Sequence, residues 1–388
     1  MSAFHELDYY AIDSLYTEEE RMARDTVRTL VDKEILPTIG KHFDEGTFPK
    51  ELVPKFGELG LLGPSLTGYG CSGMSPTAYG LICQELERGD SGIRSFCSVQ
   101  GSLCMYPIWA YGSEEQKNKY LPGMAAGKII GCFGLTEPDH GSDPGGMLTK
   151  AVKTDKGYIL NGTKRWITNG SIAQIAIVWA KLEGKVRGFI VPTDSKGFTA
   201  QDIKGKWSLR ASYTSELIME DCEIAADAIL PEVSGLRGPL GCLTQARFGI
   251  AFGAVGAMQA CYDEALHYVR DRPQFGKPLA GFQLVQQKLA YMVTEITKAQ
   301  LLNLQLGRLK EAGNMRPQHV SLAKRNNCYE AREIARMARD MLGANGVTVD
   351  YQCGRHMLNI ESIFTYEGTH DIHTLVIGND VTGISAFS

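Results

Sequence analysis

The sequence predicts a multidomain α+β protein in which a helical region, a β domain and a second helical region follow one another. The chain has 388 residues, more than one ordinary hydrophobic core organises, so two or three structural units are expected. Its first and last thirds repeat apolar residues at helical spacing, whereas short apolar and β-branched runs fill the middle. We therefore expect domains at 1–129, 130–233 and 234–388.

The N-terminal region contains signals for helix starts and stops. Thr17 and Glu20 predict a capping box ahead of an apolar run, which Pro37 is expected to end. Pro76 fits the first turn of a later helix, and Gly89 fits its end. We expect this region to be mainly helical.

The middle region is typical of a small antiparallel β domain that ends near Pro231. Asn-Gly pairs at 161–162 and 169–170 and a Glu-Gly pair at 183–184 separate its short runs, and such pairs favour hairpin turns.

The C-terminal region predicts a bundle of long helices. Apolar residues recur at steps of three and four from Phe282 to Leu309, which indicates one face of a long helix. Pro317 opens another helix that we expect to end at Gly343.

Composition excludes several classes of function. The formal net charge of −4 gives no basic field for a nucleic-acid backbone. The ten cysteines form no Cys-x-x-Cys pair, so we expect buried thiols in a reducing compartment. The first ten residues lack a basic region followed by an apolar run, and no apolar stretch is long enough to cross a bilayer. We expect neither secretion nor membrane insertion.

Four segments combine reactive side chains with small residues that expose the backbone. They lie at 133–143, 272–276, 340–346 and 366–369, and the last isolates the carboxylate of Glu367 between a tyrosine and a glycine. Taken singly, each is more typical of an ordinary strand-end turn, helix end or surface carboxylate.

In this order, the four segments closely resemble the acyl-CoA dehydrogenase family, and the resemblance covers almost the whole chain. The segments 87–100 and 369–373 are most similar to glutaryl-CoA dehydrogenases. The resemblance implies an N-terminal helical domain, a middle β domain, a C-terminal four-helix bundle and a homotetramer. It also implies FAD bound between the β and C-terminal domains.

The implied chemistry agrees with the residue types. Dehydrogenation removes a weakly acidic proton α to a thioester, so its carboxylate base must be desolvated to raise its pKa. The resemblance makes Glu367 this base, and Tyr366 and Gly368 would limit its contact with water. For the enolate oxygen, the resemblance implies two donors, the Glu367 N–H and a ribityl hydroxyl of FAD.

The resemblance carries the FAD contacts over residue by residue. It implies flavin contacts from the β domain, and adenosine contacts from C-terminal stretches, one of them contributed by a neighbouring subunit. The implied FAD-binding residues are Phe133, Leu135, Thr136, Gly141, Ser142, Trp166, Ile167, Thr168, Arg272, Phe275, Gln283, Asp340, Met341, Leu342, Gly343, Ala344, Thr369, His370 and Asp371.

Substrate contacts are implied in the same way. The stretch 240–247 matches the CoA-binding helix, although alone it is typical of any helix start. The implied substrate-binding residues are Glu87, Arg94, Ser95, Ser98, Ser142, Leu240, Gly241, Cys242, Leu243, Thr244, Gln245, Ala246, Arg247, Tyr366, Gly368 and Phe387.

Arg94 indicates the class of acyl chain, because a guanidinium binds a distal carboxylate whereas a methyl end favours an apolar pocket. Glu87 lies near a predicted helix C-terminus, where the helix dipole disfavours it. A solvated surface Glu also fits that position, and the resemblance favours a Glu87–Arg94 pair. Tyr366 stands where non-decarboxylating relatives carry Val. We therefore expect oxidation and decarboxylation of glutaryl-CoA to crotonyl-CoA and CO2.

Alternatives remain open. A non-decarboxylating glutaryl-CoA dehydrogenase and a short- or branched-chain acyl-CoA dehydrogenase are the nearest, followed by a catalytically inactive flavin-binding homologue and a helical scaffold without cofactor. His370, Asp371 and His373 offer too few ligands for a metal, so none is expected.

The resemblance also implies a biological setting. It suggests electron-transfer flavoprotein as electron acceptor and a role in lysine and tryptophan degradation. Absence of a transit-like segment favours a bacterial cytoplasm, and a processed chain of the mitochondrial matrix has the same features.

Overall fold

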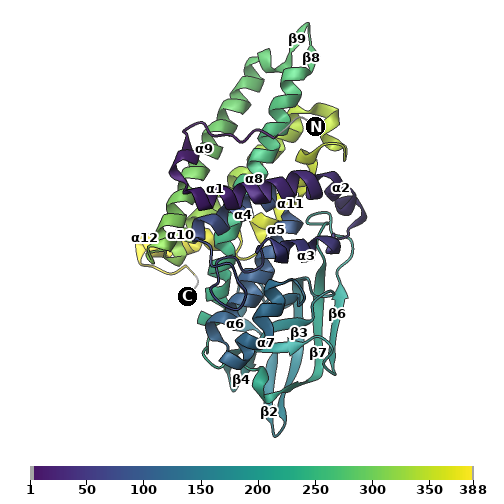
Figure 1. Ribbon diagram of the computed structural model, residues 1–388, viewed down its shortest axis with the longest axis vertical. Coiled ribbons are helices and arrows are strands. Elements are labelled where there is room, and N and C mark those ends of the chain that lie inside the picture. The colour runs from purple at the N-terminus through teal and green to yellow at the C-terminus, as the bar shows by residue number, and fades with distance from the viewer. Residues whose placement is uncertain (1–3, 387–388) are drawn as a thin grey trace.

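Helices from both ends of the chain pack together, and the main β-sheet lies at one end of an elongated molecule (Figure 1). The computed structural model describes residues 4–386. The order of helical, β and helical regions is the one predicted. The helices of the first region are α1 (Glu18–Leu30), α2 (Leu36–Glu45), α3 (Val53–Glu58), α4 (Pro76–Gly89), α5 (Ser91–Ser98), α6 (Tyr106–Tyr111) and α7 (Glu114–Ala125).

The start of α1 confirms the predicted capping box, but Pro37 does not end the helical run. The Thr17 side chain accepts the Glu20 N–H, and the Glu20 carboxylate accepts the Thr17 N–H. A π-helical segment, Val31–Ile35, then leads directly into α2. Pro37 therefore falls in the first turn of α2, where its missing N–H has no intrahelical partner to lose.

Helices α4 and α5 bring two predicted site residues into the interior. Pro76 and Gly89 bound α4 as predicted. Asp90 caps α5 by accepting the Gly92 N–H, and its other oxygen accepts hydrogen bonds from Arg355 at 2.6 Å and Asn359 at 2.9 Å. The junction that places Glu87 before Arg94 is thus fixed to the C-terminal region.

The sheet is mixed rather than purely antiparallel. Its order is β1-β4-β2-β3-β7-β6, with β5 on β4, and β4 pairs in parallel with both β1 and β2. The strands are β1 (Gly131–Gly134), β2 (Lys150–Thr154), β3 (Gly157–Thr168), β4 (Ile175–Leu182), β5 (Lys185–Pro192), β6 (Phe198–Asp202) and β7 (Thr214–Ala225).

Only one of the three predicted turn pairs closes a hairpin. The pair at 183–184 joins β4 to β5, with φ of 50° and 77°. The pair at 161–162 lies inside β3 at a bulge, where a side chain at position 162 would come within 2.4 Å of Thr149. The pair at 169–170 forms a turn between β3 and β4, which do not pair with each other.

The C-terminal region confirms the predicted helices. Its core joins apolar faces of four long helices, and the short hairpin of β8 (Pro273–Gln274) and β9 (Lys277–Pro278) projects from one end (Figure 1). The helices are α8 (Arg237–Asp271), α9 (Gln283–Glu311), α10 (Pro317–Met341), α11 (Gln352–Thr365) and α12 (His370–Thr382).

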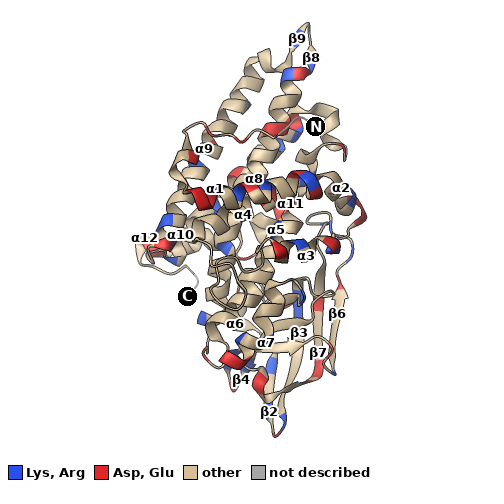
Figure 2. Cartoon of the chain, in the orientation of Figure 1, with Lys and Arg blue, Asp and Glu red and all other residues tan. Residues whose placement is uncertain are grey.

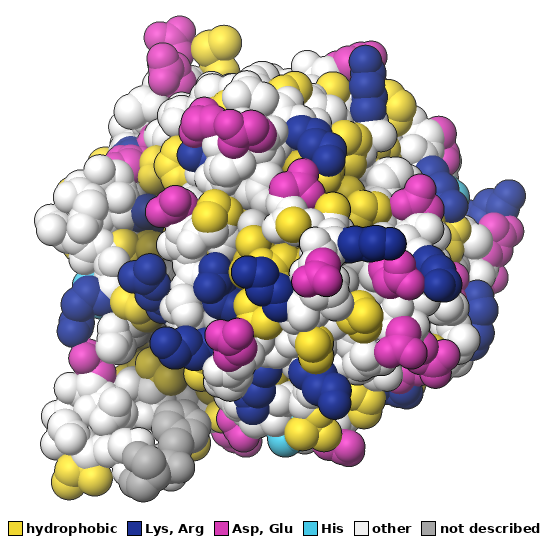
Figure 3. Space-filling model, turned by 90° about the horizontal axis from the view of Figure 1, so that it is seen from below, with side chains coloured by type: hydrophobic (Ala, Val, Ile, Leu, Met, Phe, Trp, Pro, Cys, Tyr) yellow, Lys and Arg dark blue, Asp and Glu magenta, His cyan; other side chains and the backbone are white. Residues whose placement is uncertain are grey.

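Charges of both signs are interspersed along the chain (Figure 2), and the face in Figure 3 mixes them with hydrophobic side chains. All ten cysteines are free, and only Cys71 is not buried. Among the described helices, none is both long and apolar enough to span a membrane.

Candidate active site

Glu367 lies in the short loop 366–369 between α11 and α12. Its backbone is left-handed, with φ of 54°, a conformation that non-glycine residues adopt mainly where surrounding contacts enforce it. Its Oε2 atom is buried and has no hydrogen-bond partner within residues 4–386. Burial raises the pKa of this carboxyl, although Arg94, Lys324 and Arg247 oppose the shift. The loop therefore presents a poorly solvated carboxylate, which is what a general base requires.

The predicted pair of Glu87 and Arg94 exists and is fully buried. Arg94 Nε donates to Glu87 Oε2, and the Arg94 guanidinium also donates to the Tyr366 hydroxyl. Ser95 Oγ lies 3.2 Å from the same hydroxyl. Burial would lower the pKa of Arg94, but Glu87 and Tyr366 hold it well above its ordinary value. A permanent guanidinium is thus connected through Tyr366 to the residue next to Glu367.

Gly253 on α8 makes room for this pair, and no pattern in the sequence pointed to it. A side chain there would come within 2.8 Å of Glu87 Oε2 and 3.4 Å of Arg94 Nε. Only a glycine lets the helix backbone approach so closely.

Two cations, the half-buried Arg247 and the buried Lys324, hold the backbone of the Glu367 loop. Arg247 Nε donates to the Glu367 carbonyl at 2.6 Å, so the side chain of this last residue of the predicted CoA stretch is directed at the Glu367 loop. Lys324 on α10 donates to the carbonyls of Tyr366 at 2.6 Å and Gly368 at 2.7 Å. Lys324 was missed by the sequence reasoning, because one lysine on a helical pattern is typical of a solvated face.

The predicted CoA stretch forms the first turns of α8, and only part of it can face a ligand. Cys242 and Ala246 are fully buried in the core, so a contact between either residue and substrate stays a prediction. They lie four residues apart and therefore share the inward face of the helix. Leu240 is exposed, and Gly241, Leu243, Thr244, Gln245 and Arg247 are half-buried.

The predicted flavin contacts cluster at the end of β1 and on β3. Trp166 lies at a bulge in β3 with φ of 64° and is 56% exposed, although it is a large aromatic side chain. Gly141 and Ser142 are exposed in the loop after β1, Thr136 and Thr168 are half-buried, and Phe133, Leu135 and Ile167 are buried. The exposed indole beside exposed backbone donors fits a flat, polar-edged ring such as a flavin.

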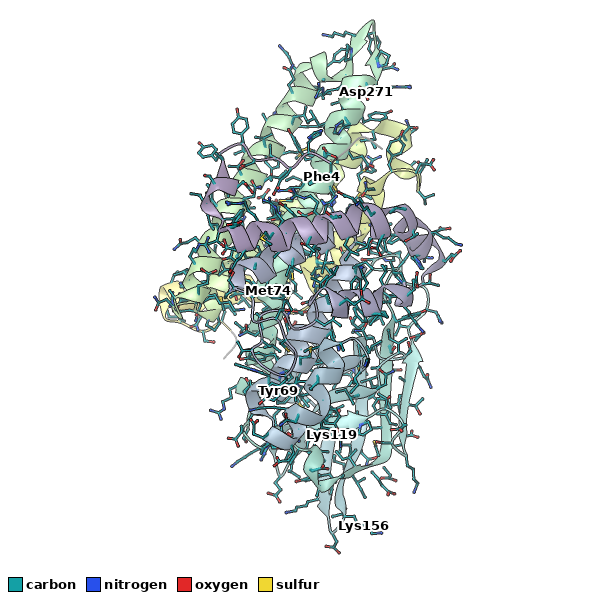
Figure 4. All side chains as sticks on the ribbon, viewed as in Figure 1. Phe4, Tyr69, Met74, Lys119, Lys156 and Asp271 are labelled. Carbon is teal, nitrogen blue, oxygen red and sulfur yellow. The ribbon has the colours of Figure 1, made fainter. Side chains whose placement is uncertain are left out.

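The predicted contacts for the adenosine part of FAD lie elsewhere. Arg272 and 340–344 line a groove of about 310 Å³. Phe275 is 93% exposed at the tip of the β8–β9 hairpin, and Gln283 is exposed at the start of α9. Asp271, next to Arg272, and Lys156, in the β2–β3 turn, lie near opposite ends of the molecule (Figure 4). The Arg272 groove therefore lies toward the end of the molecule opposite the β2–β3 turn.

The remaining predicted residues surround the start of α12. Thr369 caps the helix by accepting the Ile372 N–H, and the His370 ring stacks on Phe364 with centroids 4.8 Å apart. Asp371 is exposed. The Ser98 side chain is buried on α5, and Phe387 lies outside the described residues. No cluster of metal-ligating side chains occurs within 4–386.

The order of domains and the Glu367 loop together define an acyl-CoA dehydrogenase. Models of the acyl-CoA dehydrogenase N-terminal, middle and C-terminal domains match 17–128, 132–222 and 234–382. The human mitochondrial short-chain specific acyl-CoA dehydrogenase is 36% identical over 93% of this chain and 89% of its own length. The chain belongs to the acyl-CoA dehydrogenase family, and it is an FAD-dependent enzyme that oxidises acyl-CoA thioesters.

Solved structures give a finer likeness. A glutaryl-CoA dehydrogenase from Mycobacterium smegmatis is 56% identical with a TM-score of 0.96, covering 97% of this chain and 98% of that one. Another from the same organism, in complex with FADH2, is 51% identical with a TM-score of 0.98 and covers both chains completely. A structure described as the electron transferring flavoprotein of Acidaminococcus fermentans is 33% identical with a TM-score of 0.91, covering 95% and 98%.

Proposed function

We propose that this enzyme oxidises glutaryl-CoA and decarboxylates the product to crotonyl-CoA and CO2. The buried Arg94 guanidinium carries the proposal, because a monocarboxylic chain that ends in a methyl group offers nothing to such a cation. The similarity to two glutaryl-CoA dehydrogenases supports the same substrate.

Glu367 acts as the base in this proposal. Its buried carboxylate takes the proton from the carbon α to the thioester, and its raised pKa brings the proton affinity closer to that of the substrate carbon. Bound FAD supplies the acceptor for the hydride that leaves the β-carbon. Trp166, the 141–142 loop and the Arg272 groove would hold FAD, the last from a second chain.

The Glu87–Arg94 pair sets how firmly the distal carboxylate is held. Part of the guanidinium is already engaged by Glu87 and Tyr366, so the substrate carboxylate shares it. A weaker grip favours decarboxylation, because a tight ion pair would stabilise the charge that must leave. The C–CO2 bond then breaks, its electrons form a dienolate, and the proton on Glu367 passes to the γ-carbon.

Assembly, electron acceptor and location belong to the same proposal. In a homotetramer, the groove at Arg272 and 340–344 of one chain would complete the FAD site of another, as the family resemblance implies. Electron-transfer flavoprotein is the proposed acceptor, and the cytoplasm of a bacterium, or the mitochondrial matrix for a processed chain, is the proposed location.

Product analysis tests the proposal directly. We expect incubation with glutaryl-CoA and an artificial electron acceptor to release crotonyl-CoA and CO2 in equal amounts. Stoichiometric accumulation of glutaconyl-CoA without CO2 would contradict the decarboxylation and leave the oxidation intact. Faster turnover of butyryl-CoA than of glutaryl-CoA would instead favour a short-chain acyl-CoA dehydrogenase, the kind of enzyme that the human relative is described as.

A further inference from the structure

Three consecutive carbonyl groups of the Glu367 loop are each held by a cation. Lys324 holds those of Tyr366 and Gly368, and Arg247 holds that of Glu367 itself, at distances of 2.6 to 2.7 Å. The two cations come from α10 and α8, which pack against each other. The loop is therefore fixed from two helices of the bundle.

Lys324 is an unusual residue in this position. It is 1% exposed, it donates to two carbonyls, and within residues 4–386 no carboxylate lies close enough to form an ion pair with it, although the Glu367 charge acts on it from a greater distance. An ammonium buried without a carboxylate partner destabilises a fold unless other polar groups compensate it. The partners of Lys324 are backbone carbonyls beside Glu367, so its charge acts on that loop.

Peptide geometry transmits the effect to the reacting atoms. In a trans peptide the C=O and the following N–H point in opposite directions. By holding the Tyr366 carbonyl, Lys324 directs the Glu367 N–H away from itself, and among residues 4–386 this N–H has no acceptor. A cation on the carbonyl also polarises the peptide and makes the N–H a stronger donor.

We propose that Lys324 is a positioning residue, which aims and polarises the Glu367 N–H toward the thioester oxygen while it fixes the left-handed conformation of Glu367. The inference rests on the proposed role of Glu367 and extends it to a side chain that acts through the backbone of the loop. It predicts that loss of Lys324 weakens enolate stabilisation specifically.

Binding of acetoacetyl-CoA to the FAD-loaded enzyme provides the test. This probe has an acidic α-proton, and its bound enolate can be followed in the ultraviolet–visible spectrum without any oxidation. The pKa of the bound probe therefore reports enolate stabilisation at equilibrium. The variants are Lys324→Met, which removes the donor, and Lys324→Arg, which keeps a cation with several donors.

Lys310→Met is the matched control. Lys310 is a lysine of α9 whose ammonium packs 4.3 Å from the Phe248 ring centroid and contacts no carbonyl of the Glu367 loop. Its removal deletes a comparable charge from the helical core without touching the loop. Lys324→Gln, which keeps a neutral donor, serves if Lys324→Met fails to fold.

We expect Lys324→Met to weaken enolisation of the bound probe by about tenfold to a hundredfold, somewhat less than loss of a direct oxyanion donor. Lys310→Met should match the wild type, and Lys324→Arg should recover most of the loss. Unchanged enolisation in Lys324→Met, or an equal loss in Lys310→Met, would overturn the inference alone. If the wild type itself forms no enolate, the role of Glu367 fails together with it.

Discussion

Two functional loops of this enzyme are held by buried lysines, and their partners differ. Lys164 on β3 donates to the Leu135 carbonyl at 3.0 Å and to the Glu137 carboxylate at 2.8 Å, which fixes the loop after β1. Lys324 holds two carbonyls of the base loop and has no carboxylate partner within the described residues. The loop after β1, which carries predicted flavin contacts, is therefore held by a lysine whose charge is neutralised by a carboxylate.

The Glu367 loop is instead held by Lys324, whose positive charge has no directly paired carboxylate within the described residues. A carboxylate paired with Lys324 would cancel the field that the peptide of Glu367 feels. The comparison teaches that a buried lysine paired with a carboxylate mainly fixes a loop in place. A buried lysine without such a partner also exerts an electric field on the loop that it holds. Four changes can break or sharpen this distinction, and they follow from the largest expected effect to the smallest.

Replacing Glu367, the proposed base, should give the largest effect. Glu367→Gln keeps the size of the side chain but cannot accept the α-proton, so flavin reduction by glutaryl-CoA should slow by at least about a thousandfold. Stopped-flow bleaching of the flavin absorbance measures this rate, with FAD content and circular dichroism as controls. Bleaching at nearly the wild-type rate would show that Glu367 is not the base, and the loop that carries it would then have no catalytic role to compare.

Breaking the ion pair of the flavin loop should affect stability rather than chemistry. Glu137→Gln leaves Lys164 buried without its carboxylate and also weakens the hydrogen bonds from the N–H groups of Leu148 and Thr149. We expect a loss of about 3–5 kcal/mol in the free energy of unfolding. Denaturant unfolding of the holoenzyme measures it.

Glu216→Gln is the control, because the Glu216–Arg165 pair is partly exposed and such pairs contribute about 0–1 kcal/mol. Equal losses in the two variants would contradict the anchoring role of Glu137.

The guanidinium of Arg94, which contacts Tyr366 in the Glu367 loop, should control which acyl-CoA the enzyme prefers. Arg94→Gln removes the partner of the distal carboxylate, so kcat/KM for glutaryl-CoA should fall about tenfold or more relative to that for butyryl-CoA. Steady-state assays with both substrates measure the ratio. Proportional losses on the two substrates would show that Arg94 only supports the fold around Tyr366.

The pH dependence of kcat should distinguish Lys324 from Lys164, and it is the smallest of the four expected effects. Burial lowers the pKa of both Lys324 and Lys164 to about 8, so each loses its charge as pH rises through that value. Arg94, Arg247, His373 and Glu367 surround the Lys324 site, and burial lowers the pKa of His373 to about 2, which leaves it neutral throughout the range.

We expect kcat to rise with pH through the raised pKa of Glu367 and to fall a few-fold above about pH 8. Lys324→Met should lose this alkaline decline, whereas Lys164→Met, if it retains FAD, should keep it. A decline of equal size in Lys324→Met would assign it to another group.

The sequence was sufficient for features that local patterns encode. The capping box at Thr17, the bounds of the helix from Pro76 to Gly89 and the hairpin at 183–184 depend on residues close in the chain, and all three are confirmed. The family and its use of FAD were also predicted, because motif order along the chain is itself a sequence property.

Tertiary contacts decided what local patterns could not. The helical run continues through Pro37 into α2 after a π-helical segment, and Gly162, at a bulge in β3, lets Thr149 approach closely. Burial of Cys242 and Ala246 depends on which face of α8 meets the core. For Gly162 and for the face of α8, the deciding contacts come from other parts of the chain.

The same reason explains the active site. The sequence determined which carboxylate and which guanidinium are present, and the resemblance assigned their roles. Only the fold set the environment of Glu367, because the cations around it come from α5, α8 and α10. Electrostatic energies depend on distance in space and on burial. The raised pKa of Glu367, the direction of its N–H and the lack of a carboxylate paired with Lys324 therefore follow from the three-dimensional arrangement.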